Sequence, residues 1–273
     1  MVLLLLLCGD LQRAGAEWIE EKPLSEWFSV PREEAEVALE EPEGYTRHFR
    51  WRIVQKGDKI TVRVFGGFGD LDWPKEQMDL SENGLVFSRP HRLQRLDEGW
   101  LAGYGLLHLG SEIRWFSPDG EESYKISDHQ VNQFLVTDDG VFAAEGLTYI
   151  DAPEWKGSVI RLSKSDGKWT TETLFTMENG DPRGIVETED GKLIVLSEPG
   201  CWTLSKDGVS EKHEELSKIV FPDRFSTAGR LGSTIYVGSE LFVMAIDLNT
   251  FEYRYLIPTE EHWQEILDSY EEP

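Results

Sequence analysis

The sequence is poor in cysteine, in basic residues and in long apolar runs, and each shortage excludes a class of protein. Two cysteines in 273 residues cannot build a disulfide framework, so the fold must depend on its hydrophobic core. Lys and Arg number 27 against 51 Asp and Glu, which gives a formal net charge of −24. Binding to nucleic acid or to an anionic membrane surface is therefore not expected. No segment reaches the roughly 18 consecutive apolar residues of a membrane span.

The sequence also lacks the short motifs that identify common enzymes. It contains no H-E-x-x-H, no G-x-S-x-G, no P-loop, no C-x-x-C and no EF-hand loop. The six histidines share no spacing typical of metal ligands. From motifs we predict no catalytic residue, no metal and no cofactor.

The first 16 residues resemble an export signal. An apolar run at residues 2–7 is followed by Ala-Gly-Ala at 14–16, an A-x-A cleavage site. We expect residues 1–16 to be a signal peptide cleaved near Ala16, which places the protein in the periplasm or outside the cell. A lipid anchor at Cys8 is the alternative, which Leu7 disfavours because lipoprotein signals have a small residue before that cysteine. Cleavage leaves Cys201 alone, in an apolar run that predicts a buried thiol.

The composition divides the remaining chain into three parts. Residues 17–44 form an acidic arm, interrupted by Pro23 and Pro31, in which a short helix over 33–40 is expected. Residues 45–258 form the main domain. Residues 259–273 begin with Thr259, a suitable N-cap, and predict a short C-terminal helix and tail.

One sequence pattern, here called the phrase, recurs four times in the main domain. A strand-like run enters an acidic Gly turn, and a second and a third apolar run follow. The turn glycines Gly99, Gly140, Gly191 and Gly232 are 41, 51 and 41 residues apart. A period of about 40 to 50 residues with several strands per unit is typical of a β-propeller.

Four clear units and one irregular unit at residues 45–88 predict an all-β fold. We expect a five-bladed propeller, with six blades as the alternative, built from four-stranded antiparallel sheets. The first strand of each clear unit is expected at 91–96, 131–137, 183–187 and 224–228. In a propeller this strand lines the central channel.

One unit carries a family resemblance. Residues 181–186 read Asp-Pro-Arg-Gly-Ile-Val, and residues 189–195 read Glu-Asp-Gly-Lys-Leu-Ile-Val. This phrase resembles the first hairpin of NHL-type and lactonase-type propellers, and its rhythm extends over about 170 residues. The resemblance implies the propeller fold. Lactonase-type propellers hold a divalent cation with Glu, Asn and Asp in the central channel, and no such set is assigned in this sequence.

Polar residues recur at one position of the repeat. The residues eight before each turn glycine are His91, Asn132, Arg183 and Arg224. Acidic residues and a histidine stand just upstream: Asp128, His129, Asp181 and Asp223. These eight residues are the predicted ligand-binding site at the channel mouth, where arginine forks suit a carboxylate or a phosphate. The alternative is that they pair with one another and close the channel.

These features predict a function class only. We expect an exported propeller that binds a small molecule or a protein without catalysis, as a monomer. Tyr149 and Trp155 in the long loop 146–157 are the expected contact residues. The alternative is a hydrolase or lyase of the lactonase or glycosidase kind with its site in the channel, and a purely structural acidic protein remains open.

Overall fold

The computed structural model describes residues 27–30, 51–56, 59–64, 74, 77–80, 90–105, 110–146, 156–177, 180–208, 210–219, 221, 227–239, 242–259 and 261. The predicted signal peptide and the short helix of the arm lie outside these residues, as does the predicted C-terminal helix and tail apart from Thr259 and Glu261.

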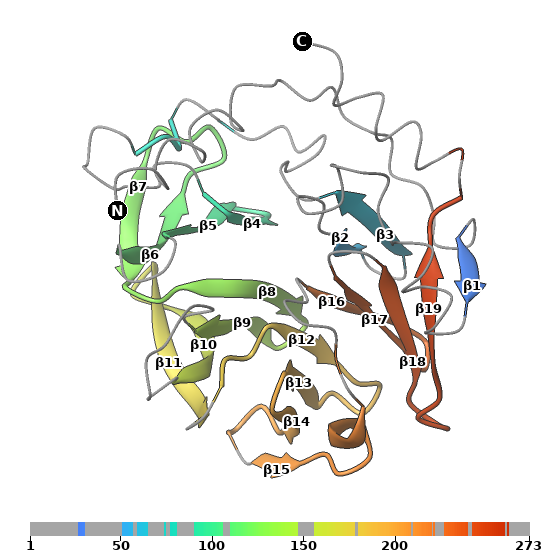
Figure 1. Cartoon of the computed structure of the whole chain (residues 1–273). Coiled ribbons are helices and arrows are strands. Elements are labelled where there is room, and N and C mark those ends of the chain that lie inside the picture. The colour runs from blue at the N-terminus through green and yellow to red at the C-terminus, as the bar shows by residue number, and fades with distance from the viewer. Residues whose placement is uncertain are drawn as a thin grey trace, which may run out of the picture.

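The described residues form five antiparallel sheets around a common centre (Figure 1). Four of these sheets, here called blades 1 to 4, each contain four strands that follow one another along the chain. Blade 1 contains β4 (Arg92–Leu96), β5 (Gly99–Gly105), β6 (Ser111–Phe116) and β7 (Ser123–Ser127). Blade 2 contains β8 (Val131–Thr137), β9 (Gly140–Gly146), β10 (Gly157–Ser165) and β11 (Lys168–Met177). The protein is therefore an all-β propeller, as predicted.

Blades 3 and 4 repeat this plan. Blade 3 contains β12 (Gly184–Glu187), β13 (Leu193–Ser197), β14 (Gly200–Leu204) and β15 (Ser210–Lys212), followed by a 3₁₀ helix, η5 (Leu216–Lys218). Blade 4 contains β16 (Ala228–Leu231), β17 (Thr234–Gly238), β18 (Val243–Asp247) and β19 (Tyr253–Ile257). The fifth sheet, here called the N-terminal blade, contains β2 (Trp51–Lys56) and β3 (Lys59–Val64). Five sheets agree with the five-bladed prediction.

The predicted first strands match β4, β8 and β12 to within one residue, but β16 starts four residues later than expected. The reason is the place of the glycine in each turn. Gly99 and Gly140 open the second strand, paired with Leu96 and Thr137, whereas Gly232 lies inside the turn between Leu231 and Thr234. A count back from the glycine therefore does not reach equivalent positions in all blades.

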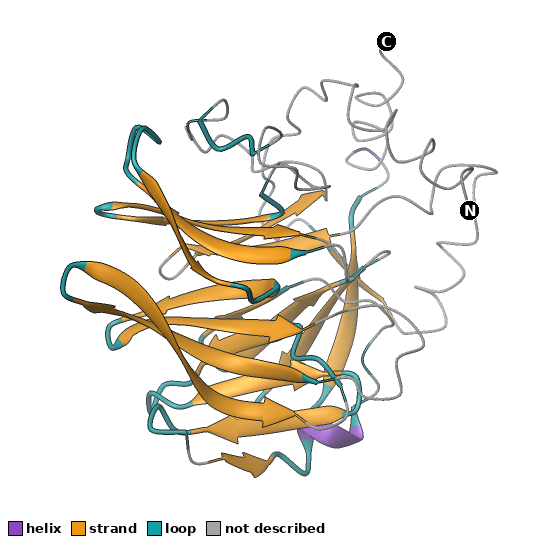
Figure 2. Ribbon diagram, turned by 90° about the vertical axis from the view of Figure 1, so that its left-hand side faces the viewer, coloured by secondary structure: helices purple, strands orange, loops and turns teal. Residues whose placement is uncertain are grey.

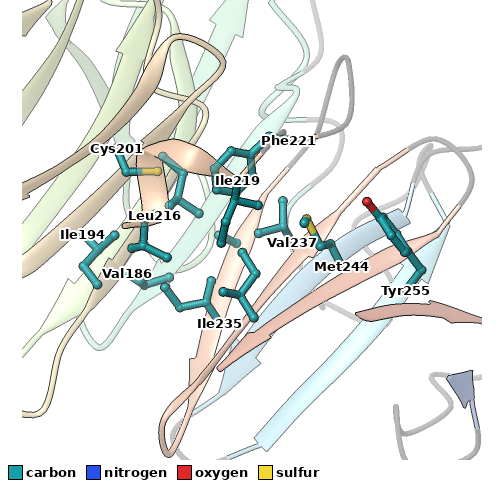
Figure 3. Packing of buried hydrophobic residues seen from close by; sticks show 13 residues of the cluster. Val186, Ile194, Cys201, Leu216, Ile219, Phe221, Ile235, Val237, Met244 and Tyr255 are labelled. Carbon is teal, nitrogen blue, oxygen red and sulfur yellow. The ribbon is translucent and has the colours of Figure 1, made fainter. Parts of the chain in front are cut away.

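Each blade is stabilised by apolar side chains on both faces. The cluster between blades 3 and 4 includes Val186, Ile194, Ile235, Val237 and Met244, which meet in Figure 3. Similar clusters fill the seams between blades 1 and 2 and between blades 2 and 3. Double-sided burial explains why β13 reads Leu-Ile-Val-Leu-Ser rather than alternating with polar residues. Cys201 is buried, as predicted. It lies in the cluster between blades 3 and 4, and burial raises the pKa of its thiol to about 12.

The ring closes where blade 4 meets the N-terminal blade. The hydroxyl of Thr227 accepts a hydrogen bond from the Ile53 amide at 2.7 Å and donates to the Ile53 carbonyl at 3.1 Å. The predicted arm contributes one strand, β1 (Phe28–Val30), which pairs with β19, the outer strand of blade 4. Trp27, just before β1, packs edge-on against Trp51 of β2 with ring centroids 4.7 Å apart. Part of the acidic arm thus lies at the seam between blade 4 and the N-terminal blade.

The propeller has two different faces, seen from the side in Figure 2. Tight turns within the hairpins, such as those between Leu96 and Gly99 and between Thr137 and Gly140, gather on one side, here called the turn face. The other side, here called the loop face, carries the starts of β4, β8 and β12 and the ends of β5, β9 and β13. The predicted channel-mouth residues belong to the loop face.

One side chain joins three of the inner strands. Gln133 of β8 donates from Nε2 to the carbonyls of Ile185, at 2.9 Å, and Ala228, at 2.8 Å. Its Oε1 accepts from the amides of the same two residues, at 3.4 and 2.8 Å. One amide thus connects the inner strands of blades 2, 3 and 4.

Candidate functional site

Four polar residues meet on the loop face above Gln133, between blades 2 and 3. They are Asn132, Asp181, Arg183 and Glu198, here called the mouth cluster. Asp181 and Arg183 lie just before β12 and are 3% and 4% exposed. Arg183 Nε lies 3.6 Å from Asp181 Oδ2, and its NH1 lies 2.7 Å from Glu198 Oε1. The Glu198 side chain is 38% exposed and forms the accessible rim of the cluster.

Asn132 attaches the cluster to blade 2. Its Nδ2 donates to the Pro182 carbonyl at 2.9 Å and lies 3.5 Å from Asp181 Oδ2. Asn132 sits at a bulge in β8, where the pairing with β9 shifts between Val131 and Gln133. The bulge turns the side chain of Asn132 towards blade 3.

The close approach of the two blades requires glycine at the ends of β9 and β10. A Cβ on Gly146 would lie 2.6 Å from the Cβ of Asp181, and one on Gly157 would lie 2.4 Å from Pro182 Cδ. No larger residue fits at either position without moving the segment that carries Asp181. The sequence Gly-Asp-Pro-Arg at 180–183 therefore packs against two glycines that are 11 residues apart.

The electrostatics of the mouth cluster are set by burial. Burial raises the pKa of Asp181; Arg183 opposes this effect and Glu198 reinforces it. Two carboxyl groups thus face one guanidinium. The cluster has an excess of negative charge when both carboxyl groups are ionised.

A second cluster lies on the loop face where blade 1 meets the N-terminal blade. It contains His91, Arg92 and Arg52, here called the basic cluster. The His91 carbonyl accepts hydrogen bonds from Arg52 NH2 at 3.1 Å and from Arg92 NH1 at 2.9 Å. Arg92 Nε also donates to the Asn132 carbonyl. Asn132 therefore contacts both clusters.

His91 contributes no positive charge to the basic cluster. Burial, followed by Arg92 and Arg52, lowers the pKa of His91 to about 3. The ring is neutral at pH 7, and because a carbonyl only accepts, Nε2 carries the proton that is donated to the Val131 carbonyl at 2.9 Å. Nδ1 is then an acceptor, and it is buried without a hydrogen-bond partner among the described residues.

Two other predicted residues lie away from these clusters. Asp128 is exposed and forms an ion pair with Lys125 on the outer strand β7. His129 Nδ1 lies 2.9 Å from the Ser127 hydroxyl, near Glu145 on the blade 1 side of blade 2. Burial raises the pKa of Glu145, while a hydrogen bond from Ser158 and the charge of His129 oppose this effect. The predicted residues Asp223, Arg224, Tyr149 and Trp155 lie outside the described residues.

The structure therefore brings together three of the eight predicted mouth residues, Asn132, Asp181 and Arg183, and places His91 beside them through Val131 and Asn132. Sequence reasoning missed Glu198, Arg92, Arg52 and Gln133. Glu198 and Arg92 are neighbours of predicted strand ends, which is a weak signal. Arg52 and Gln133 carried no signal, because their partners lie 39 and more residues away.

Within the described part of the chain, no three His, Cys, Asp or Glu side chains lie close enough to hold a metal ion. The helical segments of that part include none long and apolar enough to cross a bilayer.

The sequence matches no known protein family and no curated protein. Solved structures do resemble the chain. A gluconolactonase from Xanthomonas campestris matches with a TM-score of 0.40 and 14% identity over 62% of this chain and 56% of its own. The extracellular domain of a one-component system protein from B. thetaiotaomicron matches with a TM-score of 0.44 and 12% identity over 76% of this chain and 28% of its own.

A puromycin hydrolase matches with a TM-score of 0.40 and 14% identity over 90% of this chain and 48% of its own. The chain therefore spans little more than half of the gluconolactonase and less than half of the other two proteins. A lactonase is among the similar structures. The likeness concerns the propeller fold and leaves activity open.

Proposed function

We propose that the protein is a binding propeller that recognises a cationic group, an ammonium or a guanidinium, at the mouth cluster on its loop face. The observation that carries the proposal is the pairing of two carboxyl groups, Asp181 and Glu198, with the single guanidinium of Arg183. A ligand cation at the exposed oxygen of Glu198 balances the excess negative charge. The same charge preference fits the net charge of −24 of the whole chain.

The bridge formed by Gln133 supports binding at the surface. Gln133 hydrogen-bonds to the inner strands of blades 3 and 4 beneath the mouth cluster. Glu198 makes the cluster accessible from the loop face, and recognition depends on the groups that line the mouth. Asn132, Asp181 and Arg183 are held by packing and hydrogen bonds, so little conformational entropy is lost when a ligand binds.

The proposal includes export. The signal-like residues 1–16 suit a protein outside the cytoplasm. Mass spectrometry of the protein secreted by its natural host tests this part, with Glu17 as the expected first residue.

The binding test uses n-butylamine and guanidine as probes and n-butyrate as the matched anion. We expect isothermal titration calorimetry to show binding of both cations and none of butyrate at the mouth cluster. Glu198→Gln removes the accessible carboxylate and is expected to weaken binding of the cations about tenfold. Glu172→Gln, an exposed glutamate on β11, is the control that makes the same change of net charge elsewhere. Absence of cation binding to the intact protein, or equal affinity in Glu198→Gln, overturns the proposal.

A hydrolase is the second candidate, favoured by the raised pKa values of Asp181 and Glu145 on the loop face. The two residues lie on opposite sides of blade 2, because Asp181 of the segment before β12 packs against Gly146 of β9, whereas the neighbouring Glu145 is bonded to Ser158 of β10. Turnover of a lactone or glycoside that is lost in both Asp181→Asn and Glu145→Gln would support this candidate over simple binding.

A further inference from the structure

Two buried glutamines lie close together in the sequence, Gln130 just before β8 and Gln133 within it. We infer that Gln130 determines the specificity of the proposed cation site, because its side-chain oxygen accepts a hydrogen bond from an N–H group of the ligand. The ligand is then a primary ammonium and not a quaternary one. This inference rests on the proposed function and deepens it by naming the class of cation.

The contrast between the two glutamines is the first step. Gln133 is 9% exposed, and its amide makes four hydrogen bonds to the backbone of Ile185 and Ala228. Gln130 is 5% exposed, and its Oε1 is buried with no hydrogen-bond partner in the ranges of the chain that the structure describes. A buried acceptor without a donor opposes folding, and most buried polar groups in proteins are paired. The needs of the fold therefore explain Gln133 but not the oxygen of Gln130.

The direction of the Gln130 side chain is the second step. The Gln130 carbonyl accepts from the Gly146 amide at 3.0 Å, one position beyond the Val131–Glu145 pair of β8 and β9. Residues that lie opposite each other in antiparallel strands project to the same side of the sheet. At Gly146 this side faces blade 3, since a Cβ there would lie 2.6 Å from the Cβ of Asp181. Gln130 therefore projects to the side of blade 2 on which the mouth cluster lies.

The chemistry beside Gly146 is the third step. Asn132 Nδ2 lies 3.5 Å from the Gly146 carbonyl and 3.5 Å from Asp181 Oδ2, so the mouth cluster reaches Gly146 directly. Gln130 adds a neutral acceptor to the carboxyl groups on this side. A primary ammonium carries one charge and three N–H donors, and can bind a carboxylate and an amide oxygen together. A quaternary ammonium has the same charge but no N–H, and would leave the Gln130 oxygen unpaired.

The experiment compares two cations of equal charge on the intact protein. Isothermal titration calorimetry at pH 7 is done with n-butylamine and with n-butyltrimethylammonium, which differ in the three N–H donors. We expect n-butylamine to bind at least tenfold more tightly, because a hydrogen bond from a charged donor is lost with the other ligand.

Two variants assign this preference to Gln130. Gln130→Met keeps the size of the side chain and removes the acceptor. We expect it to weaken binding of n-butylamine about tenfold and to leave n-butyltrimethylammonium unaffected. Its urea midpoint should be unchanged or higher, since no hydrogen bond is lost from the folded protein. Gln130→Glu keeps an acceptor oxygen and is expected to bind n-butylamine at least as tightly as the wild type. Gln94→Met, on the inner strand β4 of blade 1, is the control and should change neither ligand.

The outcomes separate the two proposals. If neither cation binds to the intact protein, both are wrong. If both cations bind equally, the cation site stands and the role of Gln130 is wrong. If the preference for n-butylamine persists in Gln130→Met, the bulk of the methyl groups sets it, and the role of Gln130 is again wrong. A lower urea midpoint of Gln130→Met, or its failure to fold, would mean that this side chain serves the fold and would overturn the inference.

Discussion

The loop face and the turn face of this propeller use the same residue types in opposite ways. On the loop face, Asp181 is buried and Glu145 is half-buried, and burial raises the pKa of each carboxyl. On the turn face, Asp119 accepts a hydrogen bond from Ser117, and Asp247 accepts from the amides of Asn249 and Thr250, and these bonds lower their pKa values. Acidic residues in turns serve the fold, whereas buried acidic residues oppose it.

The difference shows where the molecule departs from the arrangement that stability alone favours. A buried carboxyl with a raised pKa costs folding free energy, and such groups gather at binding and catalytic sites. On the turn face, acidic residues pair with lysines instead. Lys206 donates to Asp139 of the preceding blade and, at 2.5 Å, to Glu187. Lys164, at the equivalent turn of blade 2, lies 2.8 Å from Glu98 of blade 1. The turn face thus repeats a lysine–carboxylate contact between neighbouring blades, whereas the loop face departs from this repeat.

The largest expected effect comes from the residue beneath the loop face. Gln133→Leu removes four hydrogen bonds to the backbone of Ile185 and Ala228 and leaves buried amides and carbonyls unpaired. We expect a loss of about 4 kcal/mol or more in the free energy of unfolding, measured by urea denaturation. Gln94→Leu, on the partly exposed inner strand of blade 1, is the control and is expected to change stability by less than about 0.5 kcal/mol. A small effect of Gln133→Leu would contradict the role of this amide in joining the inner strands of blades 2, 3 and 4.

The second effect concerns the ion pairs of the mouth cluster. Arg183→Met leaves Asp181 buried without its cation, and we expect a loss of about 3 kcal/mol at pH 7. The double variant Arg183→Met with Asp181→Leu removes both charges and is expected to recover most of that loss, since an apolar pair can replace a buried ion pair. Failure of the double variant to recover stability would mean that Arg183 acts by packing alone.

How well the sequence predicts a feature of this molecule depends on how far apart along the chain the contacting residues lie. The hairpins of blade 1 and blade 2 are local, and their acidic Gly turns placed β4 and β8 to within one residue. Arg183 and Asp181 are two residues apart and could be joined from the sequence. Gln133 was not predicted, because its partners on β12 and β16 lie 52 and 95 residues away and any polar residue on an inner strand has the same pattern.

The third effect belongs to the turn face. Lys206→Met removes a cation from between two blades, and we expect a loss below about 1 kcal/mol, smaller than that of Arg183→Met because the lysine is reached by water and by salt. Lys164→Met is expected to have a still smaller effect, since its side chain is 41% exposed against 17% for Lys206. Unfolding in low and in high salt checks this: the effect of Lys206→Met should shrink at 1 M NaCl, whereas that of Arg183→Met should persist. Equal salt sensitivity would remove the distinction between the two faces.

The smallest effect is the dependence of stability on pH, and it has opposite signs on the two faces. Because the folded pKa of Asp181 is raised above 3.8 and that of Glu145 above 4.5, their favourable contribution is complete below the unfolded values and is lost as the pH rises through the folded values. The folded pKa of Asp119 is lowered below 3.8, so its contribution is present at neutral pH and is lost as the pH falls through the folded value. On acidification from pH 7 to pH 4, the stability of the wild type relative to Asp181→Asn should therefore rise. Relative to Asp119→Asn it should hold down to about pH 4 and fall as the pH drops further towards the folded value. Urea unfolding of the three proteins from pH 7 to well below pH 4 measures both dependences, and a change of the same sign in the two comparisons would mean that burial does not govern the loop-face carboxyls.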